Sequence, residues 1–343
     1  NTNLELVAEA WGSGSEAITG TTHTITMADG ASDAARAFAL TLTGSITATN
    51  TVTLAPNTVS KTWVIQNNAG YQVTISQGTG ANVVIPNGGI KMLVTDGAGA
   101  GAAVTDVLDM TGGTGNVGLG SGSLGTAITT GTDNVAIGEA ALDAVTTGSD
   151  NTAVGDNALG ANTTASNNTA VGSGALLVNT TGASNVAIGM NALTSNTTAD
   201  DNTSVGKGTL SSNTTGANNT GIGRAALGQN TTGSSNVAVG GLALDANTTA
   251  GSNVAVGYAA LSANTTGTNN TSIGTGSLEL NTTTSGNTAV GTNALEANVA
   301  ANNTAVGLNA LVANTTGTDN VAIGRASLQA NTTASENTAV GQG

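Results

Sequence analysis

The feature that most constrains the fold is a sequence repeat with a fixed period of seventeen residues. The stretch "NTAVGDNALGANTTASN", residues 151–167, is followed at once by "NTAVGSGALLVNTTGAS". The glycine that marks each repeat recurs every seventeen residues except from Gly291 to Gly307, a step of sixteen, and a degenerate copy, Asn116 to Gly120, ends eighteen residues before Gly138. A fixed short period is typical of a solenoid, in which each repeat is one coil stacked on the next. The marker glycines are Gly138, Gly155, Gly172, Gly189, Gly206, Gly223, Gly240, Gly257, Gly274, Gly291, Gly307, Gly324 and Gly341.

The first half of each repeat has the pattern of a short strand. It reads N-[VT]-A-[VI]-G, with β-branched residues two apart, so we predict one strand per coil with Thr152 and Val154 on a shared face. Leu159 is the largest apolar group of its coil, and Ala158 precedes it at a position that we expect to be tight. Leucine recurs at this position in twelve complete units, from Leu142 to Leu328, which predicts an internal ladder of leucines. We expect the leucine and the Val or Ile of each coil to be buried.

The second half of the repeat, ANTTG, has the composition of a turn. Asn tolerates the left-handed backbone conformation, Gly adopts it freely, and Thr hydroxyls bond to neighbouring backbone groups. Stacking would also align the Asn side chains into amide ladders. The Asn and Thr residues of the repeat are therefore interpreted as structural.

Residues 1–115 hold no repeat, but they contain both tryptophans, Trp11 and Trp63, and the only phenylalanine, Phe38. Segments of alternating apolar and polar residues, separated by Gly, Asn and Pro, predict a compact antiparallel β-domain of the sandwich type. The stretch Ala31–Leu42 fits a helix or a strand about equally. The expected fold is therefore all-β, with a β-sandwich-like domain over residues 1–115 and a β-solenoid of about fourteen coils over residues 116–343. The alternating segments are TVTLAP, KTWVIQNN, YQVTISQG, ANVVIPNGG and IKMLVTDGAG.

Composition argues against several classes of function. The net charge of −14 comes from 20 acidic residues and six scattered basic ones, so we expect no nucleic-acid partner, because phosphate binding needs a basic stripe. No apolar run approaches twenty residues, so we expect no membrane span. The chain has no cysteine, and His23 is its only histidine, which we interpret as a turn or strand residue. Without Ser-His-Asp, Cys-His or His-rich metal sites, we expect neither an enzyme nor a cofactor.

Two weaker motifs are better explained by structure. The stretch GSGSLG, residues 120–125, fits G-x-G-x-x-G, but it lies in a degenerate coil and does not open a helix. Acidic residues precede the coil Asn in several repeats and could attract Ca²⁺, but Asn or Ser stands there in others, so no regular metal site is expected. The acidic residues are Asp133, Asp150, Asp201 and Asp319.

The position directly after the marker glycine is the most variable of the repeat. A stacked interior would not accept Lys, Tyr and Gly interchangeably, so we expect this position to be exposed and to carry any partner-specific contacts. Tyr258, the only aromatic residue of the repeats, is either a stacking platform for a sugar or an isolated surface residue. The candidate contact residues are Met190, Lys207, Arg224, Tyr258, Leu308 and Arg325.

The unit N-x-[AS]-[VI]-G-x-x-A-L resembles the repeats of trimeric autotransporter adhesin heads, and the longer form with NTTG is similar to repeats of bacteriophage fibre proteins. The segment Val59–Val104 is similar to a β-domain of phage tail fibres. The resemblance covers roughly residues 51–343 and implies left-handed parallel β-rolls that pack as homotrimers. The period of seventeen is longer than the fourteen or fifteen residues usual in autotransporter heads.

These patterns favour a structural and adhesive fibre of a phage virion, located outside the cell, that forms a homotrimeric shaft for host attachment. Each coil has few large apolar groups to bury, so further burial between chains is expected. The expected partners are other copies of the chain, other virion proteins and a host-surface glycan or protein receptor. Two alternatives are a bacterial surface adhesin head and an ice- or surface-binding solenoid that uses a ladder such as Thr163, Thr180, Thr197 and Thr214. The last repeat stops partway, which predicts more chain or another subunit beyond Gly343.

Overall fold

The computed structural model describes residues 12–27, 36–110, 115–125 and 128–343, and β-strands dominate its regular structure. The all-β fold class is confirmed. The chain divides into two compact units, residues 1–140 and 141–343. The first unit includes the first two coil strands, so the domain boundary predicted between residues 115 and 116 falls inside it. Trp11 lies outside the described residues.

The first unit contains two sheets that face each other. The five-stranded sheet has the order β1-β3-β5-β8-β9, and the four-stranded sheet has the order β2-β4-β6-β7. A 3-10 turn, η2 (Gly99–Gly101), precedes the last of these strands. The strands are β1 (Ser13–Ala17), β2 (Thr22–Thr26), β3 (Ala39–Thr43), β4 (Asn50–Ala55), β5 (Ser60–Asn68), β6 (Val73–Ser76), β7 (Val83–Ile85), β8 (Ile90–Asp96) and β9 (Val104–Met110).

The prediction of a purely antiparallel domain is wrong for the first six strands. From β1 to β6 the chain crosses to the other sheet after every strand, so strands that become neighbours within one sheet run in the same direction. Among the described strands, antiparallel pairing is confined to β6 with β7, β5 with β8, and β8 with β9. The part of Ala31–Leu42 that the structure describes ends in strand β3, and residues 31–35 lie outside the described ranges.

Large apolar side chains from both sheets form the core of the first unit. Ile18, Leu42, Ile65 and Ile75 have no exposed surface, and Trp63 is 2% exposed. The Lys61 ammonium lies 4.0 Å from the centroid of the Trp63 ring, a cation–π arrangement. This unit therefore buries the large side chains that the repeats lack.

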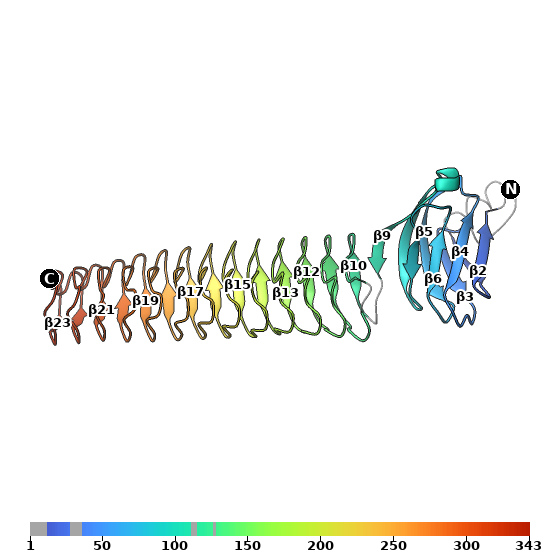
Figure 1. Cartoon of the computed structure of the whole chain (residues 1–343). Helices are drawn as coiled ribbons and strands as arrows, with labels where there is room; N and C mark the ends of the chain where they lie inside the picture. Colours follow the sequence, from blue (N-terminus) through green and yellow to red (C-terminus); the bar gives the residue numbers. More distant parts are fainter. Residues whose placement is uncertain (1–11, 28–35, 111–114, 126–127) are drawn as a thin grey trace. The chain divides into compact units, whose positions relative to one another are not determined.

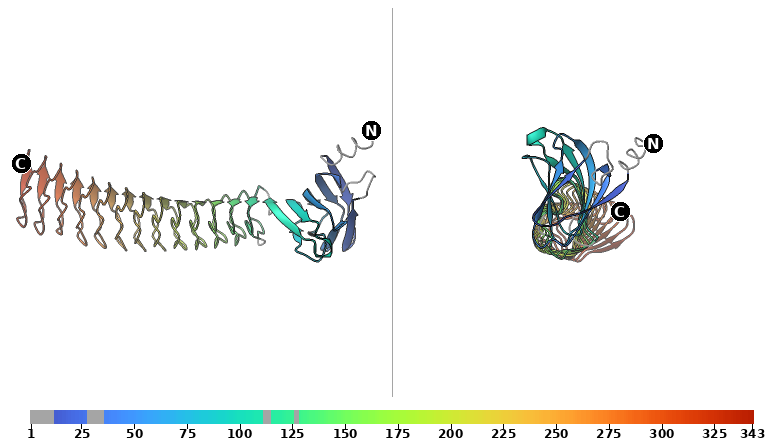
Figure 2. Two further views of the ribbon diagram at one scale, coloured as in Figure 1. Left: turned by 90° about the horizontal axis from the view of Figure 1, so that it is seen from above. Right: turned by 90° about the vertical axis from the view of Figure 1, so that its right-hand side faces the viewer.

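The coils form one parallel sheet of fourteen strands in sequence order (Figure 1). The strands of the second unit line one side of the stack, and the turns lie on the other side (Figure 2). The coil strands are β10 (Val117–Leu119), β11 (Val135–Ile137), β12 (Thr152–Val154), β13 (Thr169–Val171), β14 (Val186–Ile188), β15 (Thr203–Val205), β16 (Thr220–Ile222), β17 (Val237–Val239), β18 (Val254–Val256), β19 (Thr271–Ile273), β20 (Thr288–Val290), β21 (Thr304–Val306), β22 (Val321–Ile323) and β23 (Thr338–Val340).

The middle residue of each coil strand points into the coil. Ala153 and Ala170 are fully buried, whereas Thr152 and Val154 are only half-buried. Thr152 and Val154 do share a face, as predicted, but the expectation that the Val or Ile of each coil is buried is wrong. Side chains alternate along a strand, so the residues on either side of a buried Ala must point outward.

The internal leucine ladder is confirmed, and Ala158 is fully buried beside it. The leucines from Leu142 to Leu311 have no exposed surface. All of them adopt the left-handed backbone conformation, with φ between 49° and 54°. This conformation costs an L-residue about 1–2 kcal/mol, which burial of a leucine side chain, at about 1.5–3 kcal/mol, offsets.

The left-handed conformation is not used where the sequence predicts it in the ANTTG turn. Asn162 and Gly182 have ordinary backbone angles, and the left-handed residues are the ladder leucine and corner positions such as Asn157 and Asn167. Asn162 has a fully buried side chain that bonds to Ala165 O, so its role is set by its amide and not by its φ angle.

The sixteen-residue coil keeps the strand register. Thr288 pairs with Thr304 just as Thr271 pairs with Thr288. The missing residue is taken from the turn, where Asn298 Nδ2 donates to a carbonyl two residues later and not three, as in the other coils. The strand register therefore tolerates a deletion in the turn.

The leucine ladder can be tested with two adjacent leucines, of which Leu176 is fully buried and Leu177 is half-buried. Leu176→Ala should lower the free energy of unfolding by about 2–5 kcal/mol, because it leaves a cavity in the stack. Leu177→Ala should lower it by less than about 1 kcal/mol. Urea unfolding followed by circular dichroism measures both, and equal losses would contradict the assignment of Leu176 to the interior.

The interior also contains a matched pair of unusual residues. Thr209 stands where most coils have Ala, and the strand position that packs on it is Gly221, where a Cβ would lie 2.6 Å from Thr209 Cγ2. Gly221→Ala should therefore destabilise the fold by about 1–3 kcal/mol through overpacking. Adding Thr209→Ala recreates the pair found in neighbouring coils and should recover most of that loss in urea unfolding. A double variant no more stable than Gly221→Ala would show that the two residues are not coupled.

Candidate functional site

The variable row consists of the residues that directly follow the marker glycines. All of its members are exposed except Gly241, which is half-buried. Tyr258 is 58% exposed, and Met190 and Leu308 are each 43% exposed. The members are Glu139, Asp156, Ser173, Met190, Lys207, Arg224, Gly241, Tyr258, Thr275, Thr292, Leu308 and Arg325.

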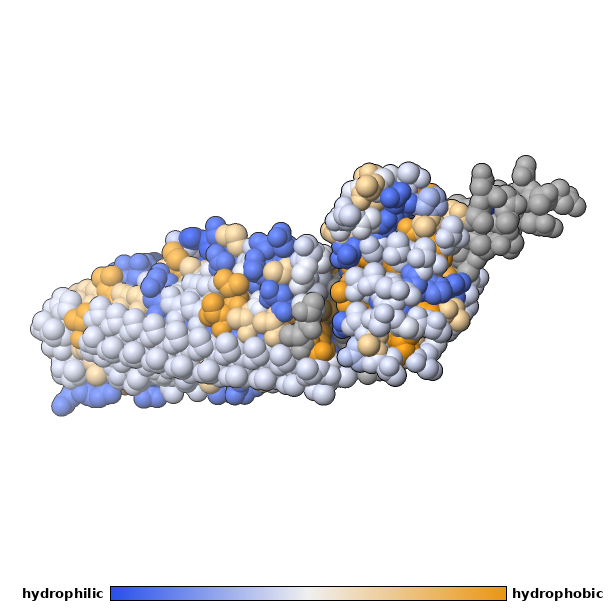
Figure 3. All heavy atoms as spheres, turned by 45° about the vertical axis from the view of Figure 1, so that its right-hand side comes forward, coloured by the Kyte–Doolittle hydropathy of each residue, from blue (hydrophilic) through white to orange (hydrophobic). Residues whose placement is uncertain are grey.

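Backbone hydrogen bonds hold the variable row in register. The carbonyl of Lys207 accepts from the amide of Ala225 at 3.1 Å, and the carbonyl of Arg224 accepts from Leu242 at 3.1 Å. The same bond recurs from coil to coil, so successive side chains of the row are spaced by one strand separation of about 4.8 Å. In Figure 3, strongly hydrophobic and hydrophilic residues of the second unit lie along its upper edge, further hydrophilic residues lie along its lower edge, and the face between them is of intermediate hydropathy.

The six predicted contact residues all lie exposed on this row. Met190, Lys207 and Arg224 come from three consecutive coils, and Leu308 and Arg325 from two others. Tyr258 is separated from Arg224 only by Gly241. Their role in binding stays a prediction.

The coil Asn residues form two buried ladders, as the repeat predicts. In the strand ladder, the side-chain oxygen of each Asn accepts the backbone N–H of the Asn one coil on, for example Asn168 N to Asn151 Oδ1 at 3.0 Å. In the turn ladder, side-chain amides bond directly, for example Asn196 Nδ2 to Asn179 Oδ1 at 2.9 Å. From Asn134 to Asn320 the Asn residues of both ladders are at most 1% exposed and are hydrogen-bonded, so they hold the stack together.

The threonine ladder is also tied to the backbone. Thr163, Thr180, Thr197 and Thr214 are half-buried, and the hydroxyl of each donates to the carbonyl of the Thr one coil on. The next residue of each turn, such as Thr164, is exposed and directs a second column of threonines to solvent.

The acidic residues before the coil Asn occupy exposed left-handed corners. Asp133, Asp150, Asp201 and Asp319 have φ of 58° or 59°. Asn, Asp and Ser share this position because short polar side chains tolerate that conformation best. Within the described ranges, no group of three or more His, Cys, Asp or Glu residues could hold a metal ion.

The weaker sequence features also have structural roles. His23 lies in strand β2, as predicted, and its Nε2 is 2.9 Å from Glu16 Oε1. Residues 120–125 form the corner of the first coil, where Leu124 is fully buried.

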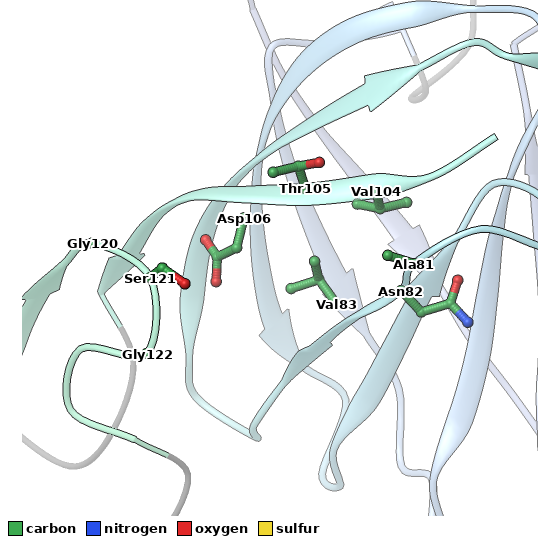
Figure 4. A pocket seen from close by; sticks show the side chains of 9 residues that line it. All are labelled: Ala81, Asn82, Val83, Val104, Thr105, Asp106, Gly120, Ser121 and Gly122. Atoms are coloured by element: carbon green, nitrogen blue, oxygen red, sulfur yellow. The ribbon is translucent and has the colours of Figure 1, made fainter. Parts of the chain in front are cut away.

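A pocket of about 420 Å³ lies within the first unit (Figure 4). Its lining brings together residues 81–83, 104–106 and 120–122. Asp106 is the one titratable side chain of this lining, and its Oδ2 is 2.7 Å from the Lys91 ammonium. The pocket therefore offers small polar groups and a carboxylate that is already paired.

Sequence reasoning missed a second surface, the outer sheet face. It consists of the first and third residues of strands β10 to β23, and every one of them is Thr, Val, Ile or Leu. Ile188, Ile222, Ile273 and Ile323 on this face are each 39–41% exposed. The signal was present in the V-A-V and T-A-V triplets, since a small middle residue places the larger neighbours on the outside.

No family model, no curated protein and no solved structure matches the chain. Among the described residues, no helix is long and apolar enough to cross a membrane. The fold defines the chain as a β-solenoid repeat protein with a two-sheet β-domain ahead of the coils.

The turn ladder can be tested at Asn196, which also receives a bond from Asn213 Nδ2 at 3.1 Å. Asn196→Asp removes the donors and buries a carboxyl group, so it should lower the free energy of unfolding at pH 7 by about 3–5 kcal/mol. Burial would raise the pKa of this carboxyl in the folded state, so the loss should shrink as the pH is lowered towards 4.

The matched control is Asn167→Asp, at an exposed corner where other coils already carry Asp. It should change the free energy of unfolding by less than about 0.5 kcal/mol. Equal stability of the two variants at pH 7 would show that the turn ladder is not buried.

Proposed function

We propose that this protein is a structural and adhesive fibre protein of a phage virion. Its coils form a homotrimeric shaft that works outside the cell and contributes to attachment to the host. Its partners are two further copies of the same chain, other virion proteins and a glycan or protein receptor on the host surface. The proposal involves no catalytic step and no cofactor.

The observation that carries the proposal is the outer sheet face. Strands β12 to β23 present an uncharged band of β-branched side chains roughly 50 Å long, at about 4.8 Å per strand. Contiguous exposed apolar surface on a soluble protein marks an interaction site. Residues such as Val205 and Val239 are restricted at χ1, so little side-chain entropy is lost when they pack.

The regularity of this face favours other copies of the same chain as its partner. Another copy carries the same band with the same spacing, so the two surfaces match along their whole length. Three copies around an axis would bury the band inside the shaft and leave the turns and corners outside. The resemblance to phage fibre repeats and autotransporter heads supports three as the number of copies.

The proposed trimer predicts a mass in solution near three times 32.7 kDa by light scattering. A monomeric mass would contradict the shaft and would favour an ice- or surface-binding solenoid, which a thermal-hysteresis assay can detect. A bacterial adhesin head would share the trimeric mass, so electron microscopy of virions labelled with an antibody to the chain distinguishes it from a phage fibre.

The interface is tested by Val205→Lys combined with Val239→Lys on the outer sheet face. Burying two uncompensated charges in each chain should shift the mass towards 32.7 kDa while circular dichroism keeps its β signal. The control adds the same charge at two exposed turn residues, Thr198→Lys with Thr249→Lys, and should stay trimeric. A trimer that survives the valine variants would place the interface elsewhere.

A further inference from the structure

We propose that Lys207, Arg224 and Tyr258 of the variable row bind an anionic polysaccharide. Gly241, which lies between Arg224 and Tyr258 in the row, has no side chain and leaves space for the ligand. This inference rests on the proposed role in host attachment and names the class of receptor and the coils that contact it. It starts from the one place where the row gathers two cations, a glycine and an aromatic ring in four consecutive coils.

The four residues stand on a rigid scaffold. Their carbonyls accept hydrogen bonds of 3.0–3.1 Å from the next coil, at Ala225, Leu242, Ala259 and Gly276 in turn. Adjacent side chains therefore leave the backbone about one strand spacing apart and on the same edge of the coils. A ligand that follows this edge meets them in order.

The two cations are not neutralised by the protein. Neither Lys207 nor Arg224 forms an ion pair within the part of the chain that the structure describes. Carboxylates can reach this edge, since Glu279 Oε2 is 3.1 Å from where a Cβ of Gly276 would stand. The equivalent positions in the two basic coils hold Ser211 and Gly228, and the coil of Gly241 holds the half-buried Asp245 at this position.

The two positive charges of Lys207 and Arg224 stand at the same position of adjacent coils, which is unfavourable unless an anion binds between them. Two like charges about one strand spacing apart repel each other, and an anion between them would remove that repulsion. In a chain with a net charge of −14, this is the one place where two basic residues occupy the same position of adjacent repeats.

The neighbouring coils supply an apolar platform. Tyr258 is the only aromatic residue of the repeats, and its ring lies over Gly241, where a Cβ would be 3.7 Å from Tyr258 Cδ2. The next residue, Leu242, is half-buried and adopts φ of 60°, a position that other coils fill with Gly, Ala or Asn. These three departures from the repeat fall together in two adjacent coils, and the exposed Tyr258 ring lies over the space that a side chain at position 241 would enter.

This combination selects the chemistry of the ligand. Guanidinium and ammonium groups bind sulfate, phosphate or carboxylate groups, and the ring offers an apolar face to the C–H side of a sugar. Two cations in a strongly acidic protein are too few to neutralise the closely spaced phosphates of a nucleic acid. A polysaccharide with spaced anionic groups fits the row along its length.

The experiment measures binding of the full chain to dextran sulfate and to uncharged dextran of the same length in about 0.1 M salt, where the Debye length is about 10 Å. The wild type should bind dextran sulfate much more tightly, and Lys207→Gln with Arg224→Gln should raise its Kd about tenfold or more. Tyr258→Ala should raise the Kd for dextran sulfate about fivefold. It should leave the Kd for polyphosphate, an anionic polymer without sugar, unchanged.

The matched control carries Thr215→Asp and Thr232→Asp, two exposed turn residues in the coils that contain Lys207 and Arg224. It changes the net charge by the same two units at another corner and should keep the wild-type Kd within about twofold, since exposed charges more than a Debye length away are largely screened. An equal loss in this control, or equal wild-type affinity for dextran and dextran sulfate, would overturn the proposal. If Tyr258→Ala changes neither Kd, the row binds anions but not sugars, which also overturns it.

Light scattering on the same samples separates this inference from the proposed function. A trimer that does not prefer dextran sulfate would reject the polysaccharide site and leave the shaft intact. A monomer that shows the preference would reject the shaft and keep the site.

Discussion

The structure depends on hydrogen bonding between identical positions of successive coils. A coil of seventeen residues has too few large side chains to hold its shape through a hydrophobic core alone. Two Asn ladders, the threonine hydroxyls and the parallel strands each bond a residue to its equivalent one coil on. Since a buried amide that loses its partner is costly, each coil fixes the position of the next.

The narrow interior determines which side chains lie on the outer surface of the coils. The strand contributes only a small side chain to the interior, and even the step from Ala to Thr at position 209 is accompanied by Gly at position 221. The larger Val and Ile residues are therefore placed outside, where they form the outer sheet face. The ladders require a narrow interior that has no room for Val or Ile. The surface proposed for trimer contacts therefore results from the same constraint.

Much of this architecture could be predicted from the sequence because a repeat averages out local ambiguity. The period, the strand triplet, the leucine ladder and the exposure of the variable row each rest on twelve or more copies of one pattern. The first unit has no such repetition, and alternation of Val73–Ser76 or Ile90–Asp96 predicts a strand without saying which neighbour it pairs with. Its parallel pairs depend on where the chain crosses from one sheet to the other. The short polar segments between the strands do not reveal these crossings in the sequence.

Errors within the repeat have a different cause. Asn and Gly in ANTTG suggested left-handed turns, but tertiary context places that conformation at Leu159, a residue that would avoid it in isolation. Burial of the Val or Ile was inferred from hydropathy, whereas the alternation along the strand decides in favour of Ala. Both cases show that local preference gives way when one side chain must fill a shared interior.

The most direct test is amide hydrogen exchange, resolved by NMR, at the strand-ladder residues from Asn168 to Asn270. Each backbone N–H of this set donates to the buried side-chain oxygen of the Asn one coil earlier. The ladder predicts that these amides exchange as slowly as those of the coil strands, with similar protection in every interior coil. Fast exchange at the Asn amides beside protected strands would contradict the ladder as the interaction that sets the stack.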